Sequence, residues 1–449
     1  MRKKWFLIAV LLVAALLLMA CRTTEQMSSV EATAAPTEEP TPTEEPVMTF
    51  IPTPEPTPTP EPTPEPTPEP TPVPTPAVVT IGAIGDIMIP SGIVMDVVTE
   101  DGAYDFSALF APVAELFQSV DLMCANLEVP IAGAEAGYSK PRETGKLFFF
   151  NAPDSLLDTL KEDGIDMLTT ANNHAMDKGA KGFFRTVEKV REAGFYQTGT
   201  FLDAADREKP LIVEINGMKL GFIAATRLMN SASNDFSRSE ARTLIGFMDG
   251  QEPCEELLAD IARTKAAGAE FIILFAHWDF ENDKPVASET RAMAKKILEA
   301  GVDCIIGSHP HRVKTGEFVT VEREDGPYTG LVLYSLGNFT ANMEFTCMVG
   351  LFAEITLEKD MITGQITLTD AGILPTYTFR RGIELPCFAV MPAYADPMRI
   401  NGLTVPLTEQ EIEVVLKARA LGLTRFGTVE GIRVLDAETE AEQTAAESE

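Results

Sequence analysis

The chain has 449 residues, a net charge of −31 and 45% hydrophobic residues. This hydrophobic content is typical of a soluble folded body and excludes a protein made mainly of membrane spans. Residues 77–435 alone hold 51 acidic and 32 basic residues, a net charge of −19. Nucleic-acid binding is therefore not expected, because contacts with phosphates need clustered Lys and Arg.

Residues 1–21 have the pattern of a lipoprotein signal peptide. Three basic residues precede an apolar run over 5–20, which is shorter than the roughly 20 residues that a bilayer span needs. The run ends at Leu18-Met-Ala-Cys21 and resembles the lipobox of bacterial lipoproteins, in which the Cys is acylated. An uncleaved anchor helix with an incidental Cys21 is the alternative. Both interpretations predict a body outside the cytoplasmic membrane, and the first predicts a lipid anchor on its extracellular face.

Residues 22–76 are predicted to be a disordered linker. Seventeen of the 32 prolines lie between Pro36 and Pro76, mostly in Thr-Pro and Glu-Pro repeats. Such a segment cannot bury a core and favours extended polyproline II, so it would act as a stalk. At the other end, residues 436–449 hold six acids and no bases and are predicted to be a solvated acidic tail.

Between these ends, apolar runs alternate with amphipathic stretches. Strands are predicted at 78–84, 121–126, 165–171, 270–276 and 302–307, and helices at 106–120, 153–163, 182–193, 255–267, 286–300 and 408–421. A hairpin over 211–225 should turn at Asn216-Gly217. Further strands at 331–336, 350–357 and 365–374 suggest a mixed α/β body with a largely antiparallel second sheet. We expect one domain over 77–380, with residues 381–435 as a C-terminal extension packing on it.

All four histidines directly follow apolar runs that read as buried strands; they are His174, His277, His309 and His311. Asp86 ends the first predicted strand, and Glu128 follows the second. Ligand sites in open α/β sheets lie at the carboxyl ends of strands. Oxygen and nitrogen donors of these types suit Mn²⁺, Fe or Zn²⁺, and a carboxylate can bridge two ions. No C-x-x-C pair is present, so a thiolate zinc site is not supported.

Each of these residues also has a structural interpretation. A single His at a strand end is commonly a hydrogen-bonded surface residue, Asp86 after a Gly could close a turn, and Glu128 could be solvated. The placement of every His and both carboxylates at strand ends favours a metal site.

Six motifs in series resemble those of the CapA family, which is named for poly-γ-glutamate capsule synthesis and is related to calcineurin-like metallophosphoesterases. They are Gly85-Asp86-Ile-Met88, Asn126-Leu-Glu128, Ala171-Asn-Asn-His174 with Asp177 and Gly179, His277-Trp278 with Glu281, Gly307-Ser-His309-Pro-His311, and Ser335-Leu-Gly-Asn-Phe339. The resemblance implies a four-layer αββα sandwich with the site at one end of its two sheets.

The resemblance also implies roles for individual residues. Two divalent metal ions would be held by Asp86, Glu128, Asn173, His277, His309 and His311, and His174 would be the catalytic residue that faces the substrate. Asn126, Asp177, Asp279, Glu281 and Asn338 would support the ligands or contact the substrate, although Gly337-Asn338 could also be a simple turn. Two departures stand out. Ordinary phosphoesterases have a His where this chain has Met88, which cannot ligate a hard cation, and Asp279 replaces a Gly that is usual in the family.

Two functions follow from these observations. The first is a metal-dependent hydrolase that acts on a phosphoester or a related anionic substrate and is linked to poly-γ-glutamate capsule biosynthesis. The second is a non-catalytic, metal-dependent component that binds or exports capsular polyglutamate together with other capsule-synthesis proteins. A metal-free adhesion domain is a third, plainer alternative.

Overall fold

The computed structural model describes residues 75–141, 149–230, 236–248, 253–382 and 387–436. The chain divides into two compact units, 1–70 and 71–449, and all described residues belong to the second. Cys21, nearly all of the predicted linker and the tail beyond Asp436 lie outside the described residues. None of the helices among the described residues combines the length and the hydrophobicity that a membrane span requires.

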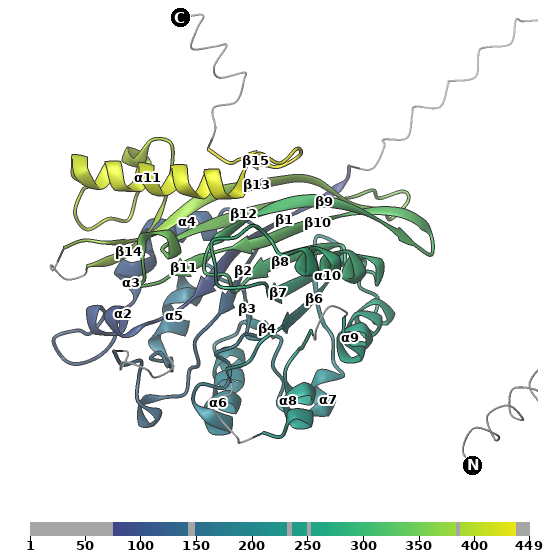
Figure 1. The fold of residues 1–449 in the computed structure, drawn as a ribbon, viewed down its shortest axis with the longest axis horizontal. Coiled ribbons are helices and arrows are strands. Elements are labelled where there is room, and N and C mark those ends of the chain that lie inside the picture. Colours follow the sequence, from purple (N-terminus) through teal and green to yellow (C-terminus); the bar gives the residue numbers. More distant parts are fainter. Residues whose placement is uncertain (1–74, 142–148, 231–235, 249–252, 383–386, 437–449) are drawn as a thin grey trace, which may run out of the picture. The chain divides into compact units, whose positions relative to one another are not determined.

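The first of two sheets has nine strands, in the order β14-β13-β12-β1-β2-β3-β4, with β11 paired to β1 and β15 paired to β13 (Figure 1). Strands β1 to β4 run parallel to one another, whereas β12, β13 and β14 extend the sheet in antiparallel fashion. The strands are β1 (Ala77–Ile87), β2 (Leu122–Leu127), β3 (Met167–Thr169), β4 (Tyr196–Thr198), β11 (Asn338–Thr340), β12 (Val349–Lys359), β13 (Ile366–Arg380), β14 (Phe388–Pro392) and β15 (Arg433–Val434).

The second sheet has six strands, in the order β5-β6-β7-β8-β10-β9. They are β5 (Leu211–Ile215), β6 (Met218–Thr226), β7 (Phe271–His277), β8 (Cys304–Ser308), β9 (Val313–Arg323) and β10 (Gly326–Leu336). The predicted hairpin is present as β5 and β6. Its turn residues Asn216 and Gly217 both have positive φ, as a tight two-residue hairpin turn requires.

The alternation of side chains along β7 shows how the layers form. Ile273 and Phe275 join the buried cluster that also contains the side chains of β1, while Ile272 and Leu274 point the other way. The second pair packs with the apolar faces of α9 (Glu255–Ala266) and α10 (Ser288–Glu299). Burial on both faces explains why these strands are continuous apolar runs.

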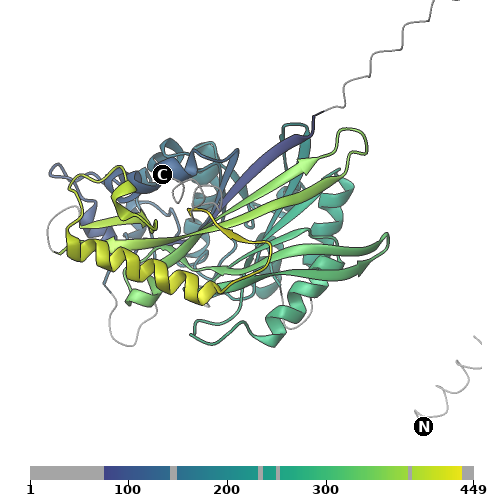
Figure 2. The ribbon, with the colours of Figure 1, turned by 90° about the horizontal axis from the view of Figure 1, so that it is seen from above.

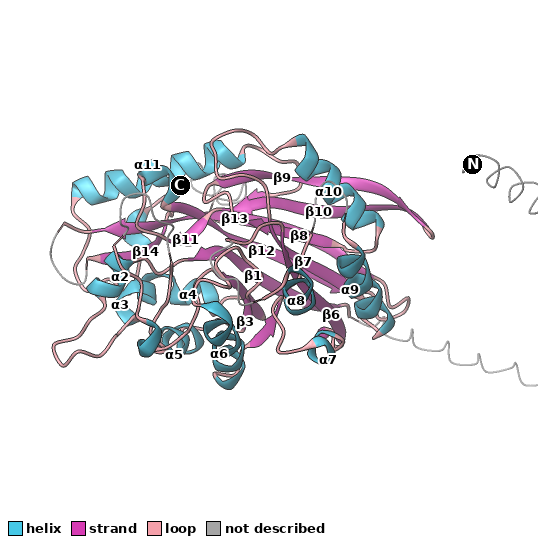
Figure 3. Ribbon diagram, turned by 60° about the horizontal axis from the view of Figure 1, so that its bottom comes forward, coloured by secondary structure: helices cyan, strands magenta, loops and turns pink. Residues whose placement is uncertain are grey.

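The outer face of the first sheet has its own helices. Helices α5 (Ser155–Glu162) and α6 (Gly179–Glu192) lie beside this sheet, while α9 and α10 lie beside the second one (Figure 3). Contacts of β1 with β8 and β10 pack the two sheets face to face. The α/β sandwich with helices outside both sheets, which the resemblance implied, is confirmed.

Two sequence-based expectations need correction. The antiparallel strands do not form a separate second sheet: β9 and β10 belong to one sheet, and β12 to β14 to the other. The helix predicted over 106–120 is broken into α3 (Ser107–Phe110), the 3₁₀ turn η1 (Ala111–Val113) and α4 (Ala114–Phe117). Pro112 lies in the break, because a proline removes one helical hydrogen bond and crowds the preceding turn.

Helix α11 (Glu409–Phe426) begins with a capping box formed by Thr408 and Glu411. It contacts β12 and β13 of the first sheet and β9 of the second, and it buries Val415 and Phe426. Figure 2 shows this helix, in yellow, lying along the strands. The remaining short helices are α2 (Ser91–Asp96), η2 (Ala134–Ala136), α7 (Ala204–Arg207), α8 (Arg238–Leu244), η3 (Phe345–Cys347) and η4 (Pro397–Arg399).

Candidate metal centre

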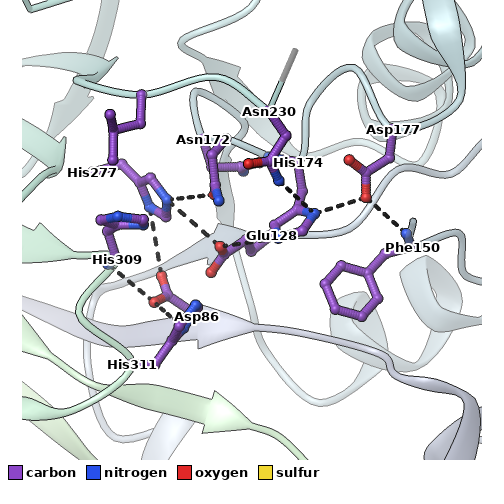
Figure 4. Close-up of polar contacts among 12 residues, drawn as sticks. Asp86, Glu128, Phe150, Asn172, His174, Asp177, Asn230, His277, His309 and His311 are labelled. Atoms are coloured by element: carbon purple, nitrogen blue, oxygen red, sulfur yellow. Dashed lines mark hydrogen bonds and ion pairs between the residues drawn. The ribbon is translucent and has the colours of Figure 1, made fainter. Parts of the chain in front are cut away.

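Five buried acid and imidazole side chains converge where strands of both sheets end (Figure 4). Their donor atoms form two groups in which all atoms lie within 4.8 Å of one another. One group is Asp86, Glu128 and His277, and the other is Glu128, His309 and His311. Glu128 belongs to both groups, which is the arrangement that a carboxylate shared by two ions requires.

Close backbone contact between the sheets brings these strand ends together. The chain passes from β10 in the second sheet to β11 in the first at Gly337, whose φ is 71°. The Asp86 N–H donates to the Gly337 carbonyl (3.0 Å). A Cβ on Gly85 would lie 1.8 Å from the same oxygen, so only glycine permits this approach.

His309 and His311 have an unusual backbone conformation. Their φ angles are 93° and 55°, a region that non-glycine residues rarely adopt. The N–H of His309 donates to Asp86 Oδ2 (3.1 Å), which ties this turn to β1. Strain of this kind clusters at functional sites, because the surrounding structure must hold it in place.

Glu128 carries the clearest indication of an ion. Its side chain is fully buried, and within the described part of the chain neither carboxylate oxygen has a hydrogen-bond partner. Burial and the neighbouring Asp86 raise the pKa of Glu128 well above its usual value. The Nδ1 of His309 is likewise buried without a partner. Buried polar atoms without a hydrogen-bond partner destabilise a fold. The oxygen and nitrogen atoms of these side chains are ligands that suit divalent Mn, Fe or Zn.

Amide and hydroxyl groups orient the ligands of the first group. Asn126 Nδ2 donates to Asp86 Oδ1 (2.7 Å). His277 Nε2 lies 2.9 Å from Asn173 Oδ1, and its Nδ1 lies 2.9 Å from Ser308 Oγ. Burial and the nearby His309 lower the pKa of His277 well below its usual value, which favours the neutral imidazole that binds metals.

In the second group, Asn338 orients His311. Asn338 Nδ2 donates to the Cys347 carbonyl (2.7 Å), so its Oδ1 faces His311 Nδ1 at 2.9 Å as an acceptor. The neutral form of His311 would then carry its proton on Nδ1 and keep a lone pair on Nε2. Burial lowers the pKa of His309 to about 3, so the His309 ring is neutral at physiological pH.

His174 lies beside the two groups and is oriented by Asp177 (Figure 4). Its Nδ1 is 2.7 Å from Asp177 Oδ2, which also accepts from the N–H of Phe150 (2.7 Å). Burial raises the pKa of Asp177, and the hydrogen bond with His174 acts in the opposite direction. The Nε2 of His174 lies 3.9 Å from Glu128 Oε1, so this nitrogen faces the centre.

A cavity of about 270 Å³ opens beside the centre, and Asn173, His174 and His311 form part of its wall. Met88 and Glu281 also line it. Met88 stands where ordinary phosphoesterases have a His, and it cannot ligate a hard cation. Each donor group nevertheless offers three donor atoms without it.

Asp279, at the position where the family has a Gly, is turned away from the cavity. Its Oδ1 accepts from Thr290 Oγ1 (3.3 Å) on α10, and Asp279 is in neither donor group. Burial raises the pKa of Asp279, against the pull of Lys314. Asp279 has a φ of 67°, a conformation that glycine adopts without strain. This backbone conformation explains why the family usually has a glycine at this position.

Four residues to which the sequence analysis gave no role also contact the site. Asn172 Nδ2 donates to the Leu127 carbonyl (2.8 Å), and Asn230 Nδ2 lies 3.4 Å from His174 Nδ1. The other two are Ser308 and Phe150, described above. Asn172 and Ser308 directly adjoin singled-out residues, a usable signal, whereas Phe150 and Asn230 reach the site only through the fold.

The fold and the site define an α/β sandwich with paired donor groups able to hold metal. The chain belongs to the family described as "Bacterial capsule synthesis protein PGA_cap", whose pattern matches residues 80–343. The resemblance to the CapA family is thereby confirmed.

Two relatives come from Bacillus. The "Capsule biosynthesis protein CapA" of Bacillus anthracis is 25% identical over 275 residues, 60% of this chain and 61% of that protein. The "PGA biosynthesis protein CapA" of Bacillus subtilis (strain 168) is 26% identical over 267 residues, 59% of this chain and 63% of that protein. The match therefore spans about three fifths of the length of these relatives.

Among solved structures, a phosphatase from Mycoplasma pneumoniae aligns with 67% of this chain and 95% of its own. The sequence identity is 12% and the TM-score is 0.37.

Proposed function

We propose that this protein is a metal-dependent hydrolase acting on a phosphoester or a related anionic substrate in the synthesis of a poly-γ-glutamate capsule. The observation that carries the proposal is Glu128, which is buried, has no hydrogen-bond partner among the described residues and is shared by two donor groups. The capsule link rests on the family description and on the names of the relatives.

The donor groups would hold the two ions as follows. Asp86 and His277 would bind one, His309 and His311 the other, and Glu128 would bridge them. Bound ions of this kind supply positive charge to a phosphoryl group and activate water. Asn173, whose Oδ1 contacts His277, would complete the first site. Since the folded body is strongly acidic, these cations would also allow it to receive an anion.

His174 is the residue suited to proton transfer. Asp177 accepts from Nδ1 and fixes the ring, so Nε2 faces the cavity, where it can stabilise a developing negative charge or protonate the leaving group. Asp177 itself is a positioning residue, because Phe150 and His174 together occupy its Oδ2.

A second function is supported by the relatives' names. The protein would bind or export polyglutamate through its metals without catalysis, together with other capsule-synthesis proteins. In both functions, acylation at Cys21 and the linker over 22–76 would hold the body at the outer face of the cytoplasmic membrane.

One experiment separates these functions. The purified full-length protein is loaded with Mn²⁺, its metal content is measured, and aryl phosphate hydrolysis is compared with that of His174→Ala. A hydrolase requires turnover well above that of the variant at equal metal content. Absence of turnover, with metal-dependent retention of polyglutamate that His174→Ala leaves intact, favours the binding function. Absence of bound metal in the wild type overturns both.

A further inference from the structure

We propose that the cavity beside the metal centre selects substrates whose organic group is small and uncharged, such as an aryl or short alkyl group, over those with a second anionic group. The inference rests on the proposed function in one respect: the reacting anion of the substrate binds at the metal centre. It concerns the part of the substrate that lies away from the donor groups.

The cavity has two chemically different sides. One side carries Asn173, His174 and His311, which belong to the centre. The rest of the wall is mainly apolar, with Met88, Pro90, Phe150, Ala341 and Met343 from three separate parts of the chain. It also holds three polar residues, Asn230, Asn342 and Glu281. Phe150 also packs against the His174 ring, with 4.5 Å between ring centroids. A substrate held by its anion at the centre would therefore place its organic group against this apolar wall.

The charges around the cavity disfavour a second anion. Among the described residues that line it, none is Lys or Arg, and Glu281 contributes a carboxylate. Four basic residues line a different cavity, of about 400 Å³: Lys284, Arg291, Lys314 and Arg425. A second anionic group beside Glu281 would lose water without gaining a cation from the described residues that line this cavity.

Part of this apolar wall is accessible to solvent: Met343, which lines the cavity, is 43% exposed.

The cavity is large enough for a small organic group. Its volume of about 270 Å³ is close to the lower end of the range of roughly 300–1,000 Å³ common for small-molecule sites. It therefore has room for a small ring next to the reacting anion.

The test compares two matched pairs of compounds that differ only in charge. 4-Carbamoylphenyl phosphate and 4-carboxyphenyl phosphate are assayed as substrates of the Mn²⁺-loaded full-length protein. The corresponding benzylphosphonates, which cannot be hydrolysed, are titrated by calorimetry. We expect the carboxamide to be preferred at least tenfold in kcat/KM and in Kd.

Two charge variants locate the preference. Met343→Lys places a cation at the cavity and should reduce the preference for the carboxamide at least threefold. Met361→Lys makes the same change at a residue that is 53% exposed and does not line the cavity, and it should leave the preference unchanged.

The outcomes are distinct. Equal binding of the two phosphonates, or preference for the carboxylate, overturns the inference, as does an equal effect of the two Lys variants. If neither phosphate is hydrolysed while the phosphonates still show the preference, the catalytic proposal fails and the inference about the cavity stands. If neither phosphonate binds to metal-loaded protein, the inference is wrong.

Discussion

Replacing Glu128 by Gln should have opposite effects on the metal-free and the metal-loaded protein. In the metal-free fold, Glu128 is a fully buried carboxylate whose oxygens have no hydrogen-bond partner among the described residues. Glutamine has nearly the same shape and still carries polar groups that need partners, but it has no charge. A buried unsatisfied group costs about 1–3 kcal/mol, and more when it is charged, so Glu128→Gln should raise the free energy of unfolding at pH 7.5 by about 1–3 kcal/mol.

Metal should reverse the order of stability. Ligand at about 100 times its Kd stabilises the native state by about 2.7 kcal/mol. Since Glu128 belongs to both donor groups, the variant should lose most of this gain. The wild type should therefore be the less stable protein without Mn²⁺ and the more stable one at saturating Mn²⁺.

The pH dependence of the metal-free difference has a definite sign. Burial raises the folded-state pKa of Glu128 above the ordinary value of 4.5, so the folded protein holds this proton more tightly than the unfolded chain. Stability then falls as pH rises from 4.5 toward the folded-state pKa. The advantage of Glu128→Gln should be small below pH 4.5 and should grow as pH rises.

Urea unfolding with and without Mn²⁺, at several pH values, measures these effects. Glu430→Gln is the matched control: Glu430 is exposed, so its replacement should change stability by less than about 0.5 kcal/mol. A metal-free Glu128→Gln protein that is 1 kcal/mol or more less stable than the wild type at pH 7.5 would refute the reasoning.

Three further substitutions test the residues that position the site. Asp177→Asn should lower kcat about a hundredfold, because the catalytic contribution of an oriented His174 is of that order, and should shift the pH–rate profile while the metal content stays unchanged. Asn338→Leu removes the acceptor that fixes the His311 tautomer, so Mn²⁺ affinity, measured by chelator competition, should fall about 10–100-fold. Gly85→Ala places a Cβ against the Gly337 carbonyl and should cost about 1–3 kcal/mol in urea unfolding, together with part of the metal binding; unchanged stability would contradict the close approach.

The sequence predicts most of the long strands, and the match is closest for strands that are buried on both faces. Residues 121–126 and 302–307 are apolar runs, and they correspond closely to β2 and β8. Strand β9, at 313–323, was not predicted because polar and charged residues such as Lys314 and Glu317 interrupt its apolar positions. The pattern of apolar residues along a strand does not show which other strand pairs with it. The division of the antiparallel strands between two sheets could therefore not be predicted.

For the candidate site, residue type and position at strand ends were enough to name the five side chains that converge. Their orientation was beyond the sequence. Asp279 turns toward Thr290, although it lies only two residues from His277. The positive φ angles of His309 and His311 depend on contacts with β1, which lies more than 200 residues earlier.

The site lies where the two sheets are in contact, and this placement explains why it lowers the stability of the fold. Asp86 comes from the first sheet and His277 from the second, and Glu128 faces both. Without an ion, the junction holds a buried carboxylate and an imidazole nitrogen with no hydrogen-bond partners among the described residues, and a strained turn at His309. An apolar core at this point would be more stable, so these groups are best explained by the ions that they would bind.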